Sequence, residues 1–197
     1  MNSEPSLAKI GAVLSGQCGG HVLAYHLSNN HASRVQALEG VVEYSYNSLI
    51  KNSHLNQDQG EDEMSVSVVE QLKLLGIQAS HDTQTRGHCD VHVEGVDHFL
   101  WIGEAKIHRD YAWLEDGFKQ LSTRYATGGY GQDHGEIIIY CRVQDGAAVL
   151  REWQKRLGKA FEDVEFIEDV IDTRLWFRTR HNCENSGLPF YIRHRLL

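Results

Sequence analysis

Asp90, Glu104 and Lys106 have side chains that could together support hydrolysis of a phosphodiester. Two carboxylates suit a hard divalent cation such as Mg²⁺, which takes one or two protein carboxylates and keeps several of its waters. A lysine beside such an ion can position a water molecule or stabilise negative charge that develops on phosphate. The three residue types therefore indicate metal-assisted hydrolysis.

The strands predicted around Asp90, Glu104 and Lys106 should bring these three side chains close together. The segments CDVHVE and HFLWIGEAKI have the apolar content of strands, and Gly95 between them predicts an antiparallel pair joined by a tight turn. Side chains alternate along a strand, so Glu104 and Lys106 should share one face. The turn should bring Asp90 near the end of the second strand. The alternative is a structural hairpin in which Glu104 and Lys106 form only a surface ion pair.

The rest of the chain predicts the elements that hold this hairpin. Apolar residues at three- or four-residue steps indicate helices, and short apolar runs bounded by turn residues indicate strands. The expected helices cover 6–28, 33–51, 65–75, 111–126 and 145–157, and the expected strands cover 77–80, 89–94, 98–107, 136–143, 163–168, 173–179 and 189–194. This order predicts a mixed α/β fold, with helices flanking a mixed central β-sheet.

One polar, acidic segment, KNSHLNQDQGEDE, lacks periodicity and is expected to be an exposed loop. It is the one plausible internal boundary in the sequence. We therefore expect an N-terminal helical segment over 1–60, packed on the core, and a main domain over 61–197.

The run of Asp90, thirteen residues, and then Glu104-Ala105-Lys106 resembles the PD-(D/E)xK, or restriction-endonuclease-like, nuclease superfamily. The family core is a helix, a β-meander, a second helix and a further strand, an order similar to that expected over 63–142. The resemblance implies that Asp90 and Glu104 bind metal with help from the carbonyl of Ala105. It also implies that Lys106 activates or orients the attacking water.

Two helices carry further candidates. Many family members add a glutamate on the helix before the meander, and Glu70 stands in the matching place; a solvated helical glutamate is the alternative. Some branches carry a Gln and a Tyr four residues apart on the helix after the ExK motif. Here Gln120 is followed by Arg124 at that spacing and by Tyr125 one residue later, so the sequence departs from the pattern. Gln120 and Arg124 share a helical face that could contact phosphate or base, or could simply be polar.

The charge balance limits how the chain could bind nucleic acid. It has 27 acidic and 19 basic residues, a net charge of −8. This balance argues against a protein that coats nucleic acid through broad electrostatic attraction, but it allows a local basic surface. The C-terminal tract TRLWFRTRHNCENSGLPFYIRHRLL is basic and aromatic, so Arg174, Arg178 and Arg180 are candidate contacts to a phosphate backbone. An edge strand pair with solvated arginines is the alternative.

Other features of the sequence argue against a membrane protein, a disulfide-rich protein and a zinc protein with a standard motif. No apolar run approaches the roughly 18 residues of a membrane span, and the N-terminus has no basic region before its mild apolar stretch, so we expect a cytoplasmic protein without a signal peptide. The four cysteines are far apart and form no CxxC pair, which predicts free thiols. The nearest approaches to a zinc motif, His88-Cys89 and His181-x-Cys183, lack the usual ligand spacing.

The sequence thus favours a nuclease that uses Mg²⁺ or Mn²⁺ and cuts DNA, with RNA as an alternative substrate, as an endonuclease or an exonuclease. The resemblance implies a homodimer or a complex with a partner protein, in prokaryotic antiviral defence or DNA repair. A first alternative is an inactive nuclease-fold module that binds DNA or a partner protein. A second is a structural or metal-binding protein that uses the 12 histidines.

Overall fold

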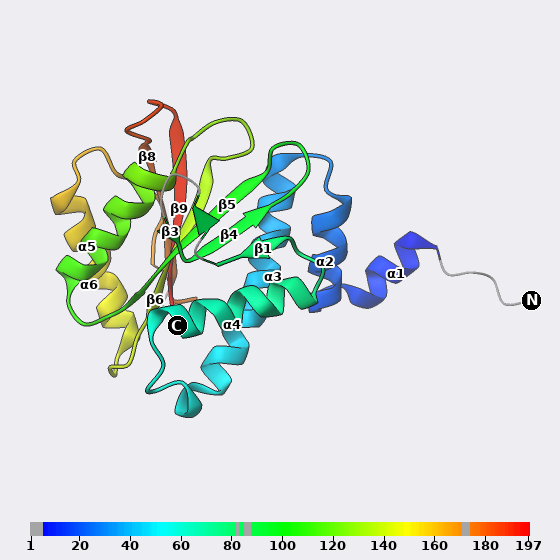
Figure 1. Ribbon diagram of the computed structural model, residues 1–197, viewed down its shortest axis with the longest axis horizontal. Helices are drawn as coiled ribbons and strands as arrows, with labels where there is room; N and C mark the ends of the chain where they lie inside the picture. The colour runs from blue at the N-terminus through cyan, green and yellow to red at the C-terminus, as the bar shows by residue number, and fades with distance from the viewer. Residues whose placement is uncertain (1–5, 82, 85–87, 171–173) are drawn as a thin grey trace, which may run out of the picture.

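A seven-stranded sheet forms the centre of the structure, in the order β1-β4-β5-β6-β9-β8-β7 (Figure 1). The computed structural model describes residues 6–81, 83–84, 88–170 and 174–197. The strands of the sheet are β1 (Ala79–Ser80), β4 (Val91–Glu94), β5 (Leu100–Ile107), β6 (His134–Tyr140), β7 (Glu165–Glu168), β8 (Trp176–Asn182) and β9 (Pro189–Leu196). A second, two-stranded sheet pairs β2 (Thr83–Gln84) with β3 (His88–Cys89).

The sheet contains both antiparallel and parallel pairs. Strands β1, β4 and β5 are successive antiparallel neighbours, which confirms the predicted hairpin. Strand β6 lies parallel to β5 on one side and to β9 on the other, while β8 and β7 continue the sheet antiparallel. A parallel neighbour requires a crossover connection, and α5 (Tyr111–Lys119) lies in the one between β5 and β6. Residues 135–140 of β6 are all buried, as expected of a central strand.

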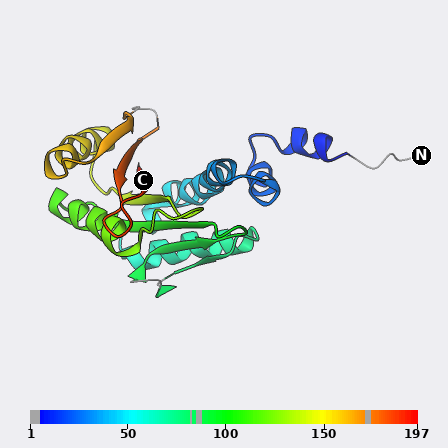
Figure 2. The same cartoon turned by 90° about the horizontal axis from the view of Figure 1, so that it is seen from above.

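Helices cover both faces of the sheet (Figures 1 and 2). Helices α3 (His31–Lys51) and α4 (Glu61–Leu74) share one buried apolar cluster with β1, β4, β5 and β6. On the opposite face, α5 and α6 (Gly146–Ala160) share a second cluster with β5, β6, β8 and β9. Helix α2 (Cys18–Leu27) contacts α3, and α1 (Leu7–Leu14) projects from the body of the molecule. The prediction of a mixed α/β fold is confirmed, and the N-terminal segment shares its core with the rest of the chain.

Two predicted helices differ in their boundaries. The helix expected over 6–28 is two helices, separated where Gly16 takes a φ of +73° that favours glycine. Helix α4 begins four residues earlier than expected, so Ser65, expected at its start, lies buried within it. The helix starts at Gly60, whose N–H donates to a carboxylate oxygen of Glu63 at 2.7 Å. That bond satisfies a backbone donor that the helix cannot satisfy itself.

Two other elements are interrupted. The strand expected over 89–94 is divided at Asp90 into the end of β3 and the start of β4. The helix expected over 111–126 begins as α5 and ends as a π-helical turn, η2 (Gln120–Tyr125). In this turn the N–H of Ala126 donates to the carbonyl of Leu121, five residues back. A short 3₁₀ turn, η1 (Ser53–Leu55), precedes α4. Cys18, Cys141 and Cys183 are thiols outside any disulfide, as predicted.

A buried ion network fixes α3 to the sheet. Arg193 on β9 is 4% exposed and donates to Glu136 on β6, with Nη2 at 2.7 Å from Oε2. Its other terminal nitrogen lies 3.2 Å from an oxygen of Glu43 on α3. Arg195 donates to both carboxylate oxygens of Glu43, at 2.9 and 3.0 Å. Helix α3 therefore meets the sheet through paired charges as well as apolar contacts.

Replacing Arg193 with alanine should lower the free energy of unfolding by about 3–5 kcal/mol, because the change leaves the fully buried Glu136 without its counter-ion. Combining it with Glu136→Gln should recover part of the loss, since the uncompensated charge is then removed. Arg174→Ala, at an exposed position, should change stability by less than about 0.5 kcal/mol. Urea denaturation of the three variants checks this, and a loss below 1 kcal/mol for Arg193→Ala would contradict it.

Candidate functional site

The candidate site forms where β5 extends beyond β4. Pairing between the two strands starts at Val91 opposite Gly103, so the edge of β5 that faces β4 has no β4 partner from residue 104 onward. Two carboxylates take the place of the missing strand. Asp90 Oδ2 accepts from the N–H of Ala105 at 2.6 Å, and Glu61 Oε1 accepts from the N–H of Ile107 at 2.7 Å.

Glu104 and Lys106 complete the cluster from β5 itself. Their side chains share one face of the strand, as predicted, and both are buried, with 3% and 5% exposed. Lys106 Nζ donates to Glu104 Oε1 at 2.7 Å and lies 3.9 Å from Glu61 Oε2. The alternative of a surface ion pair is therefore wrong, because the pair is inside the molecule. We call Glu61, Asp90, Glu104 and Lys106 the carboxylate cluster.

Helix α5 shapes the space around Lys106. Gly117 faces the lysine so closely that a Cβ there would lie 2.8 Å from Lys106 Cγ. The glycine thus gives the lysine stem room, although glycine weakens a helix interior. Trp113 lies 5.0 Å from Nζ, measured to its ring centre, and donates from Nε1 to Glu61 at 2.9 Å. The ammonium is held by carboxylates on one side and an aromatic ring on the other.

The helical carboxylate of the cluster is Glu61, and Glu70 is not part of it. Glu70 lies nearer the other end of α4, is 59% exposed and pairs with Lys73 at 2.8 Å. The structure therefore corrects the prediction for Glu70 in favour of its solvated alternative. Glu61 was missed because it stood in a segment expected to be an exposed loop. The acidic triplet at 61–63 is the signal that was present, but acidic residues are common in the first turn of any helix.

The carboxylate cluster has more acidic groups than basic ones, because it holds three carboxylates and one ammonium. Burial, followed by the negative charge of Asp90, raises the pKa of Glu104 to about 7, although Lys106 acts in the opposite direction. Burial also raises the pKa of Asp90, against the effect of the hydrogen bond from Ala105. Within the described residues, Glu104 Oε2 is buried and has no hydrogen-bond partner.

These features fit a hard divalent cation. The carboxylates of Asp90 and Glu104 offer oxygen ligands, and Glu104 Oε2 is free to coordinate. A strand residue directs its N–H and C=O to the same edge. Since the N–H of Ala105 faces Asp90, its carbonyl is expected at that edge too. A bound cation would supply the positive charge that the three carboxylates lack.

The segment after α5 carries a second unsatisfied group. Gln120 Oε1 is buried without a hydrogen-bond partner among the described residues. Gln120 follows Gly117 by three residues, so both lie on the helix face toward β5. In a π turn, position 125 takes the place over position 120 that position 124 has in an α-helix. The side chain of Arg124, the other predicted contact on this helix, lies outside the described residues.

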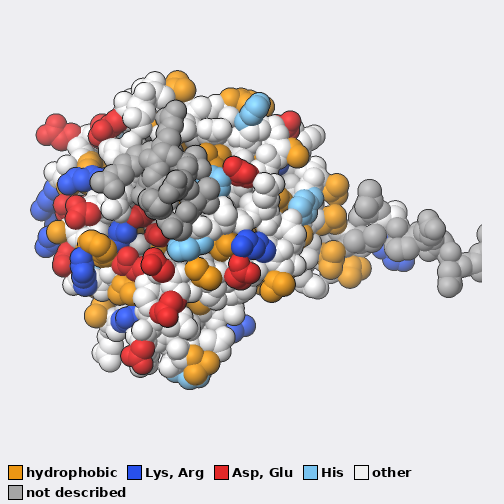
Figure 3. All heavy atoms as spheres, viewed as in Figure 1, with side chains coloured by type: hydrophobic (Ala, Val, Ile, Leu, Met, Phe, Trp, Pro, Cys, Tyr) orange, Lys and Arg blue, Asp and Glu red, His pale blue; other side chains and the backbone are white. Residues whose placement is uncertain are grey.

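The arginines of the C-terminal tract do not join the cluster, because β8 is separated from β5 by β6 and β9. Arg178 donates to both oxygens of Glu39 on α3, at 3.0 and 2.9 Å. Arg180 donates to Glu165 at 2.8 Å, and Arg174 is exposed, 5.5 Å from the ring of Trp176. Arg178 and Arg180 are therefore both engaged in ion pairs within the molecule. The side chain of Arg178 is only 14% exposed and β8 lies between β9 and β7, so Arg178 is not solvated at a sheet edge as the alternative held. On the face in Figure 3, the visible Lys and Arg side chains are interspersed with Asp and Glu.

A cavity of about 720 Å³ lies beside the ends of α3 and β6, and no residue of the carboxylate cluster lines it. No helix in the described part of the chain is long and apolar enough to cross a membrane. Comparisons of the chain with protein-family models, with curated proteins and with solved structures find no match.

In metal-free protein, the free energy of unfolding should fall as pH rises from about 4.5 to about 7. Over this window Glu104 keeps its proton in the folded state but loses it in the unfolded chain, so raising the pH favours unfolding. Glu136, whose pKa is also about 7, adds the same trend. The test is therefore the difference between wild type and Glu104→Gln, on the order of 3 kcal/mol across the window. Parallel pH curves from urea denaturation would contradict the burial of a proton-holding Glu104.

Proposed function

We propose that this chain is a nuclease of the PD-(D/E)xK kind, dependent on Mg²⁺ or Mn²⁺, that hydrolyses phosphodiester bonds in DNA. The observation that carries the proposal is the buried convergence of Asp90, Glu104 and Lys106, in which Glu104 Oε2 has no partner within the described residues. An unpaired buried carboxylate oxygen costs stability in a hairpin that is only structural. A bound cation would satisfy that oxygen.

The surrounding elements support the proposal. Helix α4, the β1-β4-β5 meander, α5 and the parallel strand β6 follow one another in the order that the sequence resemblance implies. Glu61 of α4 then fills the role of the additional helical glutamate that was assigned to Glu70. In addition, the π turn brings backbone position 125 over position 120, and this supports comparing the five-residue spacing here with the four-residue spacing of the family pattern.

Each residue then has a role. Asp90 and Glu104, with the carbonyl of Ala105, would hold the cation, which when bound polarises the phosphate and lowers the pKa of a bound water. Lys106, fixed against Gly117 and Trp113, orients the attacking water or stabilises charge on the phosphate. Glu61 holds the backbone of Ile107 and the indole of Trp113, and so positions the end of β5. Gln120 offers an unpaired amide oxygen to the substrate or to a bound water.

A second candidate is a nuclease-fold module that binds DNA or a partner protein without cutting. It is favoured by the net charge of −8 and by the arginines whose charge is neutralised inside the molecule. In either case a partner protein, or a second copy, would supply part of the DNA-binding surface. A role in antiviral defence or DNA repair is part of the same proposal.

Substitutions in the carboxylate cluster should separate the two candidates. Asp90→Asn and Glu104→Gln should abolish cleavage of plasmid or single-stranded DNA, because each removes a cation ligand. Lys106→Ala should lower the single-turnover rate about a hundredfold or more while DNA affinity falls only modestly, since the ammonium acts mainly in the transition state. Glu61→Gln should reduce the rate by less, because the amide oxygen can still accept from Ile107.

The matched control is Glu70→Gln, on the same helix but exposed, which should leave cleavage unchanged. Circular dichroism should show that each variant is folded. If wild type cuts neither DNA nor RNA with Mg²⁺ or Mn²⁺, alone or with a partner, and Lys106→Ala only binds more weakly, the nuclease is excluded and the binding module remains.

A further inference from the structure

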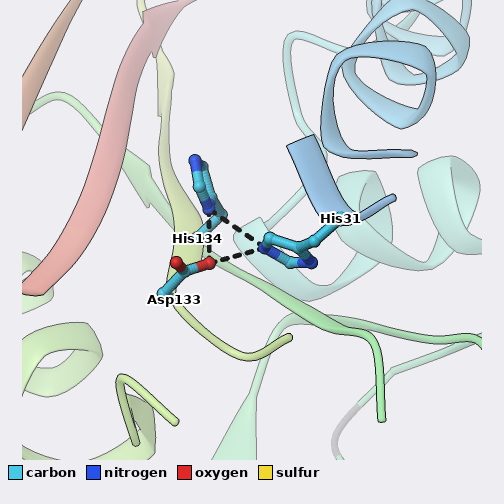
Figure 4. Close-up of side chains that lie close together, drawn as sticks. All are labelled: His31, Asp133 and His134. Carbon is cyan, nitrogen blue, oxygen red and sulfur yellow. Dashed lines mark hydrogen bonds and ion pairs between the residues drawn. The ribbon is translucent and has the colours of Figure 1, made fainter. Parts of the chain in front are cut away.

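A second group of ligand side chains lies at the other end of β6, away from the carboxylate cluster. Within the described residues it is the one group of three His, Cys, Asp or Glu side chains whose ligand atoms all lie within 4.8 Å of one another. Its members are His31, at the start of α3, and the adjacent residues Asp133 and His134, at the start of β6. Figure 4 shows the three side chains pointing toward a common centre.

The three ligand atoms are close enough to share one ion, although the two distances from Asp133 are those of hydrogen bonds and would lengthen to about 3.3 Å around a tetrahedral metal. Asp133 Oδ1 lies 2.5 Å from His31 Nε2 and 2.7 Å from His134 Nδ1. The two ring nitrogens lie 3.3 Å apart. In a tetrahedral zinc site with Zn–N bonds of 2.0–2.1 Å, two ligand nitrogens are separated by about 3.3 Å. The two imidazoles thus already stand at the separation that zinc requires.

The surroundings hold the rings in place and leave them reachable. His134 stacks on Tyr191 with ring centres 4.9 Å apart, and His31 lies 5.4 Å from Phe99. The three ligand side chains are 18–29% exposed, so the group is partly shielded but open to solvent. Asp133 Oδ1 lies within hydrogen-bonding distance of a nitrogen on each ring and so offers one oxygen ligand beside the two nitrogens.

We propose that His31, Asp133 and His134 form a zinc site that ties α3 to β6. Two nitrogen ligands and one oxygen select a transition metal over Mg²⁺, which prefers oxygen alone. Three protein ligands leave a fourth position for water, as in open zinc sites. The site links residues 102 positions apart in sequence and so fixes the entry of α3 to the sheet. It is separate from the proposed nuclease function, and zinc found in the protein is not evidence against that function.

Zinc binding to the full chain tests this proposal. Chelator-treated protein, titrated with ZnCl₂ in buffer containing Mg²⁺, should bind one equivalent and gain thermal stability, because a ligand of the folded state stabilises it. Cobalt(II) in place of zinc should give a visible absorption band with nitrogen ligands. His31→Ala and Asp133→Asn should each weaken binding more than about tenfold and lose the band. His54→Ala, at an exposed histidine of η1, should retain both.

Glu104→Gln distinguishes this site from the carboxylate cluster and should bind zinc like wild type. The proposal is wrong if wild type takes up no zinc, or if folded His31→Ala and Asp133→Asn bind it unchanged. It is also wrong if Glu104→Gln alone loses the metal, because zinc would then occupy the carboxylate cluster. Should His31→Ala not fold, Asp133→Asn and the cobalt spectrum decide the matter.

Discussion

The backbone of β5 extends past the last residue that β4 can pair with, and the candidate site depends on that constraint. Buried N–H groups at the edge of a sheet must find acceptors. Here the acceptors are the carboxylates of Asp90 and Glu61. Because the same residues form hydrogen bonds to the backbone, the strand fixes their positions. The carboxylates that accept hydrogen bonds from the edge of β5 therefore have fixed positions beside Glu104 and Lys106, where a cation could coordinate them.

Ion pairs between arginines and glutamates join α3 to the other half of the sheet. There Arg193 and Arg195 on β9, and Arg178 on β8, meet the acids Glu39 and Glu43 on α3. The basic and aromatic composition of the C-terminal tract thus has a structural cause, because its arginines neutralise one face of a helix. Each of these three arginines is paired with an acid, which offsets the cost of removing its charge from water. The carboxylate cluster is the contrast, since its acids outnumber its one cation.

The features of the candidate site that could be predicted from the sequence are those that depend on local residue patterns. Alternation along a strand placed Glu104 and Lys106 on one face, and the glycine turn placed Asp90 beside them. The sequence could not predict contacts made over long separations. Glu61 reaches a backbone N–H 46 residues away, and its helical position was hidden in a segment without periodicity. The partners of Arg178 lie 139 residues distant, so its charge alone could not show whether it faced solvent or an acid.

The two candidate metal sites lie at opposite ends of the same parallel strands. Trp101 of β5 stands opposite His134, while Glu104 and Lys106 stand opposite Ile137 and Ile139 further along β6. The sites also differ in chemistry, because one offers oxygen ligands and the other mainly imidazole nitrogen. Ions with different preferences could therefore occupy them together without exchange. In that arrangement the ion held by His31, Asp133 and His134 would stabilise one end of the sheet. The carboxylate cluster at the other end would keep an excess of negative charge, which favours cation binding and catalysis but lowers the stability of the fold.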